Sequence, residues 1–210
     1  MQIAVLGHGH VGGALADQLE RAGHAVTIAT DDRASESLAR LLARNPRLAV
    51  APPREAIAQA AVVFLAIPYQ ANAEVLPLLA DALAGRILVD CTNPVGPRLT
   101  HGIGASSGTE AIQAMLPATP VVKAFSVYGY ENFEDNRFPG AGVRPVMPFC
   151  GDSAEAKRVV GTLIAELGWE PLDVGGAVQA LHLEHMTLLW VRMVRMGGRS
   201  PHLVWAMLTR

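Results

Sequence analysis

The chain opens with the stretch Gln2-Ile3-Ala4-Val5-Leu6-Gly7-His8-Gly9-His10-Val11-Gly12, which decides the fold. Residues 2–6 form a short apolar run, as in a buried β-strand, and residues 10–22 carry Val11, Leu15 and Leu19 at helical spacing. The glycine pattern between them therefore follows a predicted strand and opens a predicted helix. That context is typical of a turn that binds the pyrophosphate of a dinucleotide.

Each glycine has a distinct physical reason in such a turn. Gly7 permits the tight change of direction, Gly9 removes a Cβ where a pyrophosphate would approach the backbone, and Gly12 lets the helix lie close to the strand. The helix N-terminus would present free N–H groups and the positive end of its dipole to the phosphates. The alternative is a glycine turn that binds no ligand. We expect the cofactor to be bound by Gly7, His8, Gly9, His10, Val11 and Gly12.

The rest of the chain alternates short apolar runs with helical patterns. Further strands are expected at residues 25–29, 48–50, 61–67, 87–90, 121–125, 146–150 and 170–174. This order predicts an α/β fold, a Rossmann-type, doubly wound and mostly parallel sheet. Loops at 92–105 and 127–145 are expected to border a binding site. We assign residues 1–175 to an NAD(P)-binding domain and residues 176–210 to a short helical C-terminal extension, apolar nearly all round, that acts as a cap or dimer element.

Composition excludes several classes of protein. Among 210 residues, 17 basic side chains face 19 acidic ones, so a nucleic-acid partner held by phosphate neutralisation is not expected. Apolar runs are too short for a membrane span, and the first residues do not resemble a signal peptide. Cys91 and Cys150 lie far apart and outside any CxxC motif, which favours a reducing, cytoplasmic compartment.

The residues after the second strand, Thr30-Asp31-Asp32-Arg33, bear on the choice of cofactor. A carboxylate at this point would bind the ribose 2′-hydroxyl of NAD, whereas an arginine would pair with the 2′-phosphate of NADP. Both residue types are present, so the pattern leaves the choice open, and His8 is a further candidate for contact with the 2′-phosphate. In the alternative interpretation, Arg33 is a surface charge and Asp31 or Asp32 is the N-cap of the next helix.

Beyond this turn, the chain resembles the NADPH-dependent coenzyme F420 reductase family. It is also similar to the wider group of dinucleotide-binding reductases that includes the oxidoreductase domain of STEAP metalloreductases. The matching segments come in the family's order and lie at residues 3–13, 36–38, 65–68, 89–94, 121–126, 150–157 and 167–175. The resemblance implies NADP(H) as the cofactor and coenzyme F420 or a flavin as a co-substrate.

The resemblance also implies where the parts of the cofactor would lie. Arg33 falls on the arginine that holds the 2′-phosphate, while Asp31 keeps NAD(H) open as the alternative. The turns Ile67-Pro68 and Asn93-Pro94 fall beside the nicotinamide. Ser126 stands where members that act on a deazaflavin tend to carry a histidine, so the identity of the acceptor stays open.

Candidate catalytic residues lie at the end of the strand over 121–125. Lys123 would contact the substrate or donate a proton, and Ser126 follows it; the alternative for Lys123 is a buried ion pair. His182 and His185 lie one turn apart on a predicted helix but lack the further partners that zinc needs, so no metal is expected. Further candidate proton donors are His101, Tyr128 and Tyr130.

These observations predict an enzyme, an NADP(H)-dependent oxidoreductase that transfers hydride between nicotinamide and a flavin-like or deazaflavin (F420-type) acceptor. A reductase of a small carbonyl or imine is one alternative, and a protein that binds NADP without turnover is another. The expected partners are a small-molecule or cofactor substrate and a second copy of the chain in a homodimer.

Overall fold

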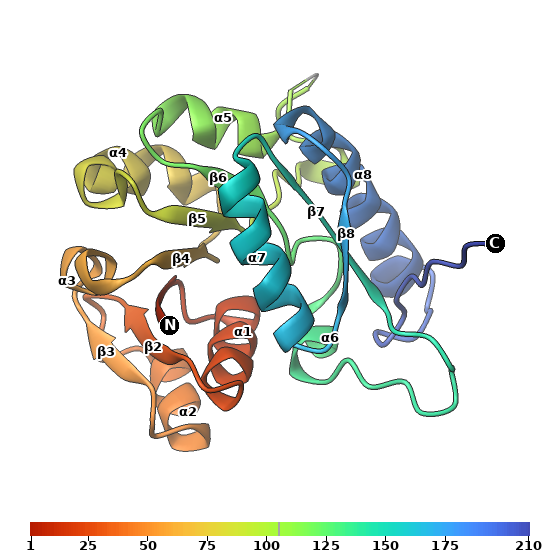
Figure 1. The fold of residues 1–210 in the computed structure, drawn as a ribbon, viewed down its shortest axis with the longest axis horizontal. Coiled ribbons are helices and arrows are strands. Elements are labelled where there is room, and N and C mark those ends of the chain that lie inside the picture. Colours follow the sequence, from red (N-terminus) through yellow and green to blue (C-terminus); the bar gives the residue numbers. More distant parts are fainter. Residues whose placement is uncertain (105) are drawn as a thin grey trace.

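The computed structural model describes residues 1–104 and 106–210; Ala105, the last residue of the expected 92–105 loop, lies outside them. Within the described residues, eight strands form a sheet of order β3-β2-β1-β4-β5-β6-β7-β8 (Figure 1). The strands are β1 (Gln2–Leu6), β2 (Ala25–Ala29), β3 (Ala49–Ala51), β4 (Val62–Leu65), β5 (Ile87–Asp90), β6 (Val121–Lys123), β7 (Val146–Gly151) and β8 (Glu170–Asp173).

The sheet is parallel from β3 to β6, and β7 pairs antiparallel to β6 and parallel to β8. The chain runs outward from β1 to β2 and β3 and then returns to place β4 on the other side of β1. This reversal makes β1 and β4 the switch point, where ligands bind in open α/β sheets. The predicted fold class, a doubly wound and mostly parallel sheet, is confirmed.

Helices cover both faces of the sheet. The longer ones are α1 (His10–Arg21), α2 (Glu36–Arg44), α4 (Asn72–Leu83), α5 (Gly108–Met115), α7 (Ala154–Glu166) and α8 (Ala180–Val191), and the short ones are α3 (Pro53–Gln59) and α6 (Tyr130–Glu134). In the described part of the chain, no helix has both the length and the apolar character needed to cross a membrane.

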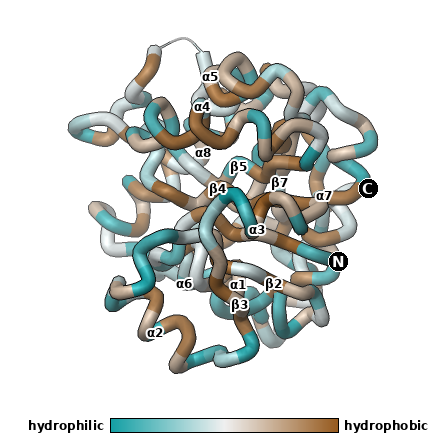
Figure 2. The backbone as a smooth tube through the Cα atoms, turned by 90° about the vertical axis from the view of Figure 1, so that its left-hand side faces the viewer, coloured by the Kyte–Doolittle hydropathy of each residue, from teal (hydrophilic) through white to brown (hydrophobic). Residues whose placement is uncertain are grey.

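Alternation of side chains along the strands divides the core in two. Ile3 and Val5 of β1 pack with apolar side chains of α1, α2, α6, α7 and α8 on one face. Ala4 and Leu6 pack with α3, α4 and α5 on the other. Because successive strand residues point to opposite faces, a strand that is apolar throughout must be covered on both sides. Figure 2 shows the hydrophobic segments gathered in the interior and hydrophilic ones mostly at the periphery.

The stretch 127–145 is not a plain loop, because it contains the short helix α6. Phe133 of this helix is buried and packs edge-on against Phe125, with Trp169 also nearby. The five-residue helix is too short for helical periodicity to be visible in the sequence, and tertiary packing stabilises it.

The prediction of a helix through the whole of 176–210 is wrong at its C-terminal part. Helical structure ends at Met196, and no helix follows over residues 197–210. Gly197, Gly198 and Pro201 explain the end, since two glycines and a proline do not continue a helix. The remaining tail packs on the core through Leu203, Val204 and Trp205.

Two hydrogen bonds to carbonyls of the tail dock it, one from the sheet and one from α8. The Val146 N–H donates to the Trp205 carbonyl at 2.9 Å, and the Trp190 indole N–H donates to the Leu203 carbonyl at 2.8 Å. The buried Tyr128 hydroxyl donates to the Val146 carbonyl at 2.7 Å and accepts from the Trp205 N–H at 3.3 Å. Tyr128 thus bridges the start of β7 and the tail.

We predict that Tyr128→Phe lowers the free energy of unfolding by about 1–3 kcal/mol, because the Val146 carbonyl and the Trp205 N–H both lose a buried partner. Urea denaturation monitored by tryptophan fluorescence measures the change. Tyr130→Phe is the matched control, since it keeps the ring that stacks on His10. Equal stability of Tyr128→Phe and wild type would contradict the bridging role.

Candidate active site

The switch point brings the ends of β1 and β4 together. The Ala66 N–H, just after β4, donates to the Leu6 carbonyl at the end of β1 at 2.8 Å. Gly7 follows β1, Gly9 is the N-cap of α1, and Ile67-Pro68 follow Ala66. The glycine turn and the Ile67-Pro68 turn therefore lie at neighbouring strand ends, as a dinucleotide crossing this edge would need.

The three glycines of the turn differ in what surrounds them. Gly7 has a φ of +105°, and a Cβ there would lie 2.5 Å from the Ala66 carbonyl oxygen. A Cβ on Gly12 would overlap the Gly7 carbonyl oxygen. At Gly9, by contrast, a Cβ would have no atom within 4 Å, and φ is −71°. The fold itself explains Gly7 and Gly12, whereas the open space beside Gly9 fits a group from outside the chain.

The first turn of α1 supplies the donors for such a group. The opening N–H groups of an α-helix have no partner within the helix, and Gly9 has no side chain with which to accept from them. The helix dipole adds positive potential at this point, and a phosphate would satisfy both. The backbone N–H groups of this turn therefore fit a pyrophosphate without help from any side chain.

His8 faces the end of β2 and the start of α2. One ring nitrogen, Nδ1, lies 2.8 Å from the Ser37 hydroxyl, and Nε2 lies 3.3 Å from the Thr30 hydroxyl. Beside them is a pocket bounded by His8, Gly9, His10, Gly13, Ser37, Arg40, Leu41, Arg44 and Glu134. The predicted residues His8 and Thr30 are thus brought together, and Ser37 joins them although the sequence did not single it out for this site.

The acidic and basic residues after β2 are all exposed. The Arg33 guanidinium donates to the Val50 carbonyl at 3.3 Å, and Asp32 accepts from the Ala34 N–H at 3.2 Å. Neither Asp31 nor Asp32 caps the next helix, because the N-cap of α2 is Ser35. Asp31 and Arg33 therefore remain accessible to a ligand at the end of β2.

The turn after β5 is held by side chains from distant parts of the chain. The Asn93 amide donates to the Ser126 carbonyl at 3.0 Å and accepts from the Thr187 hydroxyl at 3.0 Å. The Thr187 hydroxyl also lies 3.0 Å from the Ser126 carbonyl. Asn93 consequently joins the loops after β5 and β6 to α8, with Pro94 next to it in the turn.

Backbone strain marks the end of β6. Phe125, fully buried, has a φ of +53°, a left-handed conformation that is costly for a bulky side chain. It directly precedes Ser126, whose carbonyl carries the two bonds described above and whose hydroxyl is buried without a hydrogen-bond partner among the described residues. Such strain persists where the surroundings over-determine it, and it clusters at functional sites.

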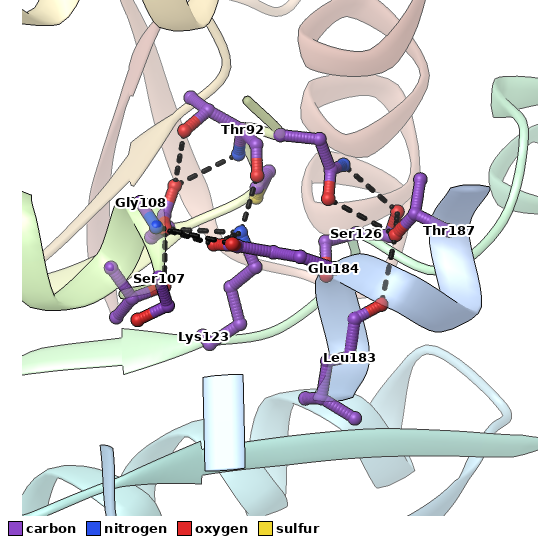
Figure 3. A network of polar contacts seen from close by, with 12 residues as sticks. Thr92, Ser107, Gly108, Lys123, Ser126, Leu183, Glu184 and Thr187 are labelled. Atoms are coloured by element: carbon purple, nitrogen blue, oxygen red, sulfur yellow. Dashed lines mark hydrogen bonds and ion pairs between the residues drawn. The ribbon is translucent and has the colours of Figure 1, made fainter. Parts of the chain in front are cut away.

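Lys123 sits in a buried ionic network (Figure 3). Its side chain is fully buried, with Nζ 3.2 Å from Asp90 and 3.3 Å from Glu184, and it donates to the Thr92 carbonyl. Burial lowers the pKa of Lys123, but the two carboxylates outweigh burial, so the pKa lies above its ordinary value. The geometry is that of the buried ion pair that the sequence left open as the alternative.

Two carboxylates share this network. Asp90, at the end of β5, accepts from Thr92 and Thr109 at 2.7 Å each. Glu184 of α8 accepts from the Gly108 N–H at 2.9 Å and lies 2.6 Å from the His101 ring. A buried carboxylate needs such donors, since burial without them is costly.

Sequence reasoning missed Glu184 and Thr187 as site residues. One signal was present: Glu184 is the sole carboxylate of α8, which contains no lysine or arginine and is largely apolar. The flanking His182 and His185 are exposed, and the His185 ring meets the His101 ring at 5.2 Å. Within residues 1–104 and 106–210, no three metal-binding side chains are grouped as an ion would need.

The chain is similar in sequence and in fold to known proteins. The model of a family described as coenzyme F420-dependent NADP oxidoreductase matches residues 2–94, which include the glycine turn and the Asn93-Pro94 turn. A solved structure from Arthrobacter sp. FB24, provisionally assigned as an F420-dependent NADP reductase, is 31% identical with a TM-score of 0.85. The similarity covers 94% of this chain and 95% of that one.

Two curated relatives extend this picture. Metalloreductase STEAP3 of Rattus norvegicus is 34% identical over 189 residues, or 89% of this chain. The F420-dependent NADP reductase of Methanocaldococcus jannaschii is 28% identical over 145 residues, or 66% of this chain. The matched regions span 36% of the rat protein and 64% of the archaeal one.

We predict that neither cysteine reacts in the native protein. Burial raises the pKa of Cys91 well above its usual range and that of Cys150 to about 12, so little thiolate forms at neutral pH. Titration with a chromogenic disulfide reagent at pH 8 should detect almost no thiol natively and both thiols in guanidinium chloride. Rapid native labelling of Cys91 would instead support a nucleophilic role for it.

Proposed function

The chain belongs to the family of coenzyme F420-dependent NADP oxidoreductases, and from this premise we propose that it transfers hydride between NADP(H) and a flavin-like or deazaflavin acceptor. Nicotinamide, when bound, supplies the hydride chemistry. The protein's part is to bind the nucleotide, orient its ring and exclude water.

The open space beside Gly9 is the observation that carries this proposal. Gly7 and Gly12 are required by contacts within the fold, but Gly9 borders no protein atom that a Cβ would strike. A bare backbone at the N-terminus of α1 suits a pyrophosphate that must approach within hydrogen-bond distance of the N–H groups. His10, stacked on Tyr130 with ring centroids 4.5 Å apart, flanks this approach.

Selection of NADP(H) rests on the end of β2. His8 and Ser37 lie together at the pocket that Arg40 also borders, and the exposed Arg33 lies on the loop before α2. A 2′-phosphate would gain charge-assisted hydrogen bonds from the arginine side chains and further hydrogen bonds from the His8 ring and the Ser37 hydroxyl. NAD(H) is the alternative, because the exposed carboxylate of Asp31 could accept a hydrogen bond from a ribose 2′-hydroxyl.

The nicotinamide end would lie by Ile67-Pro68 and Asn93-Pro94. The Asn93 amide donates a hydrogen bond to the Ser126 carbonyl, and Thr187 bonds to both residues, which gives this edge of the sheet a rigid wall. We assign Ser126 to contact with the acceptor or the nicotinamide, and Lys123 to support of the wall from behind, since the ammonium is fully buried.

The state of the candidate proton donors favours transfer between cofactors. Three of the four candidates are engaged within the protein: Lys123 is paired with two carboxylates, His101 lies against Glu184, and Tyr128 donates to a backbone carbonyl. The fourth, Tyr130, stacks on His10 of the glycine turn. Reduction of a carbonyl or imine needs a donor within reach of the substrate. A flavin or deazaflavin can take its proton from solvent, so it makes no such demand on the protein.

We predict that Gly9→Ala weakens NADPH binding by at least about tenfold, because the methyl group occupies the space beside the first turn of α1. Its stability should stay within about 1 kcal/mol of wild type. Gly12→Ala is the matched contrast: its Cβ meets the Gly7 carbonyl, so a loss of about 3 kcal/mol or more is expected. Calorimetric titration and thermal melts separate the two effects. Unchanged NADPH affinity in Gly9→Ala would contradict the binding of a pyrophosphate at the N-terminus of α1.

The acceptor is tested by mixing the protein–NADPH complex with coenzyme F420, FMN, riboflavin, a cyclic imine and a small ketone in a stopped-flow instrument. Loss of NADPH absorbance with F420 or a flavin is the expected result. Oxidation by the imine or ketone alone would transfer the assignment to a carbonyl or imine reductase. Binding of NADPH without oxidation by any acceptor would indicate a nucleotide-binding protein without turnover.

A further inference from the structure

α8 presents two buried polar side chains to the strand ends. Its sequence is apolar over most of its length, yet Glu184 is 1% exposed and Thr187 is 6% exposed. They lie three residues apart, so they share one face of the helix. Burial of a polar side chain costs free energy unless the side chain forms hydrogen bonds or ion pairs there.

Glu184 joins four separate parts of the chain. Its carboxylate accepts from the Gly108 N–H at the start of α5, at 2.9 and 3.1 Å, and lies 3.3 Å from Lys123 of β6. It also lies 2.6 Å from His101 in the loop after β5. Figure 3 shows Glu184 reaching from α8 toward Lys123 and Gly108. His101 and Gly108 are thereby tied to α8 and, through Lys123, to the sheet.

Thr187 makes the second connection, one turn further along α8. Its hydroxyl lies 3.0 Å from the Asn93 side-chain oxygen and 3.0 Å from the Ser126 carbonyl. The Lys123 ammonium, held by Glu184, donates to the Thr92 carbonyl next to Asn93. The two connections therefore meet at the neighbouring residues Thr92 and Asn93, and Thr187 also reaches the strained Phe125-Ser126 turn.

Stability alone is a weak account of this network. A buried ion pair commonly contributes little net stability over an apolar substitute of similar volume. Lys123 already has Asp90 as a partner, so Glu184 adds a second negative charge to a pair that is balanced without it. What Glu184 uniquely provides is a fixed distance between α8, β6, α5 and the loop after β5.

We propose that Glu184 and Thr187 are positioning residues for the nicotinamide: through Lys123, Thr92 and Asn93 they hold the wall against which the ring is placed. This inference rests on the proposed function, because it takes the Asn93-Pro94 turn as the nicotinamide edge. It extends the site to α8, whose residues act on the ring only through the loops that they hold. In the part of the chain that the structure describes, the side-chain hydrogen bonds of His8, Thr30 and Ser37 at the adenosine end do not reach this network.

The test compares two nucleotide probes on matched variants. NADPH reports both halves of the site, and adenosine 2′,5′-bisphosphate reports the adenosine half alone. The variants are Glu184→Gln, which keeps the size and an acceptor oxygen, and Thr187→Val, which is nearly isosteric; His182→Gln, exposed on the same helix, is the control. Affinities, the emission of bound NADPH, thermal stability, and kcat and KM with coenzyme F420 or the active acceptor are measured.

For Glu184→Gln and Thr187→Val we expect NADPH affinity to fall roughly tenfold and the blue-shifted emission of bound NADPH to move toward that of free NADPH. Affinity for adenosine 2′,5′-bisphosphate should stay within about twofold of wild type. Turnover should show a fall in kcat of about tenfold to a hundredfold, larger than any rise in the KM for the acceptor. His182→Gln should match wild type.

Several outcomes would overturn the inference. If both variants keep wild-type NADPH affinity and emission, the network does not position the ring. If they lose affinity for both probes equally, or only lose thermal stability, the network serves the fold. Thr187→Val keeps the question decidable if Glu184→Gln does not fold. Failure of the wild type to bind either probe would instead remove the proposed function, and this inference with it.

Discussion

The close approach of α1 to β1 and β4 is the constraint on which the rest of the structure depends. Gly12 lies against the Gly7 carbonyl, and Gly7 lies against the Ala66 carbonyl, at separations that leave no room for a Cβ. This approach sets the N-terminus of α1 directly over the ends of the two central strands. The free N–H groups of the helix and the turns after β4 and β5 are consequently brought to one edge of the sheet. A looser turn would keep the strands but separate the parts of the site.

Local patterns predicted most of the fold because the sheet is buried on both faces. A strand such as β4, apolar at every position, is recognisable without its neighbours, and the glycine turn fixes the order of the first strand and helix. The patterns gave no sign of α6, which has five residues and depends on Phe133 packing against Phe125 and Trp169. They also extended the last helix too far, because apolar residues such as Leu203 and Val204 continue past the glycines that end it.

The candidate site divides in the same way. Residues 7–12 lie within one turn, so their pattern could be read from consecutive positions, and His8 and Thr30 lie at neighbouring strand ends. The contacts of Asn93 with Ser126 and Thr187 span 33 and 94 residues, and that of His101 with Glu184 spans 83. Such pairings depend on how the loops after β5 and β6 and α8 come together, which propensity and periodicity do not specify. An acid in an apolar helix indicates that a buried partner exists, but it does not indicate which one.

The cofactor and acceptor parts of the proposed site differ in how easily substitutions could change them. The pyrophosphate part of the proposed site depends on backbone N–H groups and on the absence of side chains, so few substitutions at Gly7, Gly9 or Gly12 are compatible with it. The proposed acceptor part depends on side chains of the loops after β5 and β6 and of α8. Among the described residues, the Ser126 hydroxyl there has no hydrogen-bond partner. Because the network bonds to the Ser126 carbonyl and not to its side chain, an exchange of the side chain at position 126 would keep these bonds. A protein built in this way could therefore keep its cofactor site while substitutions change the acceptor that it binds.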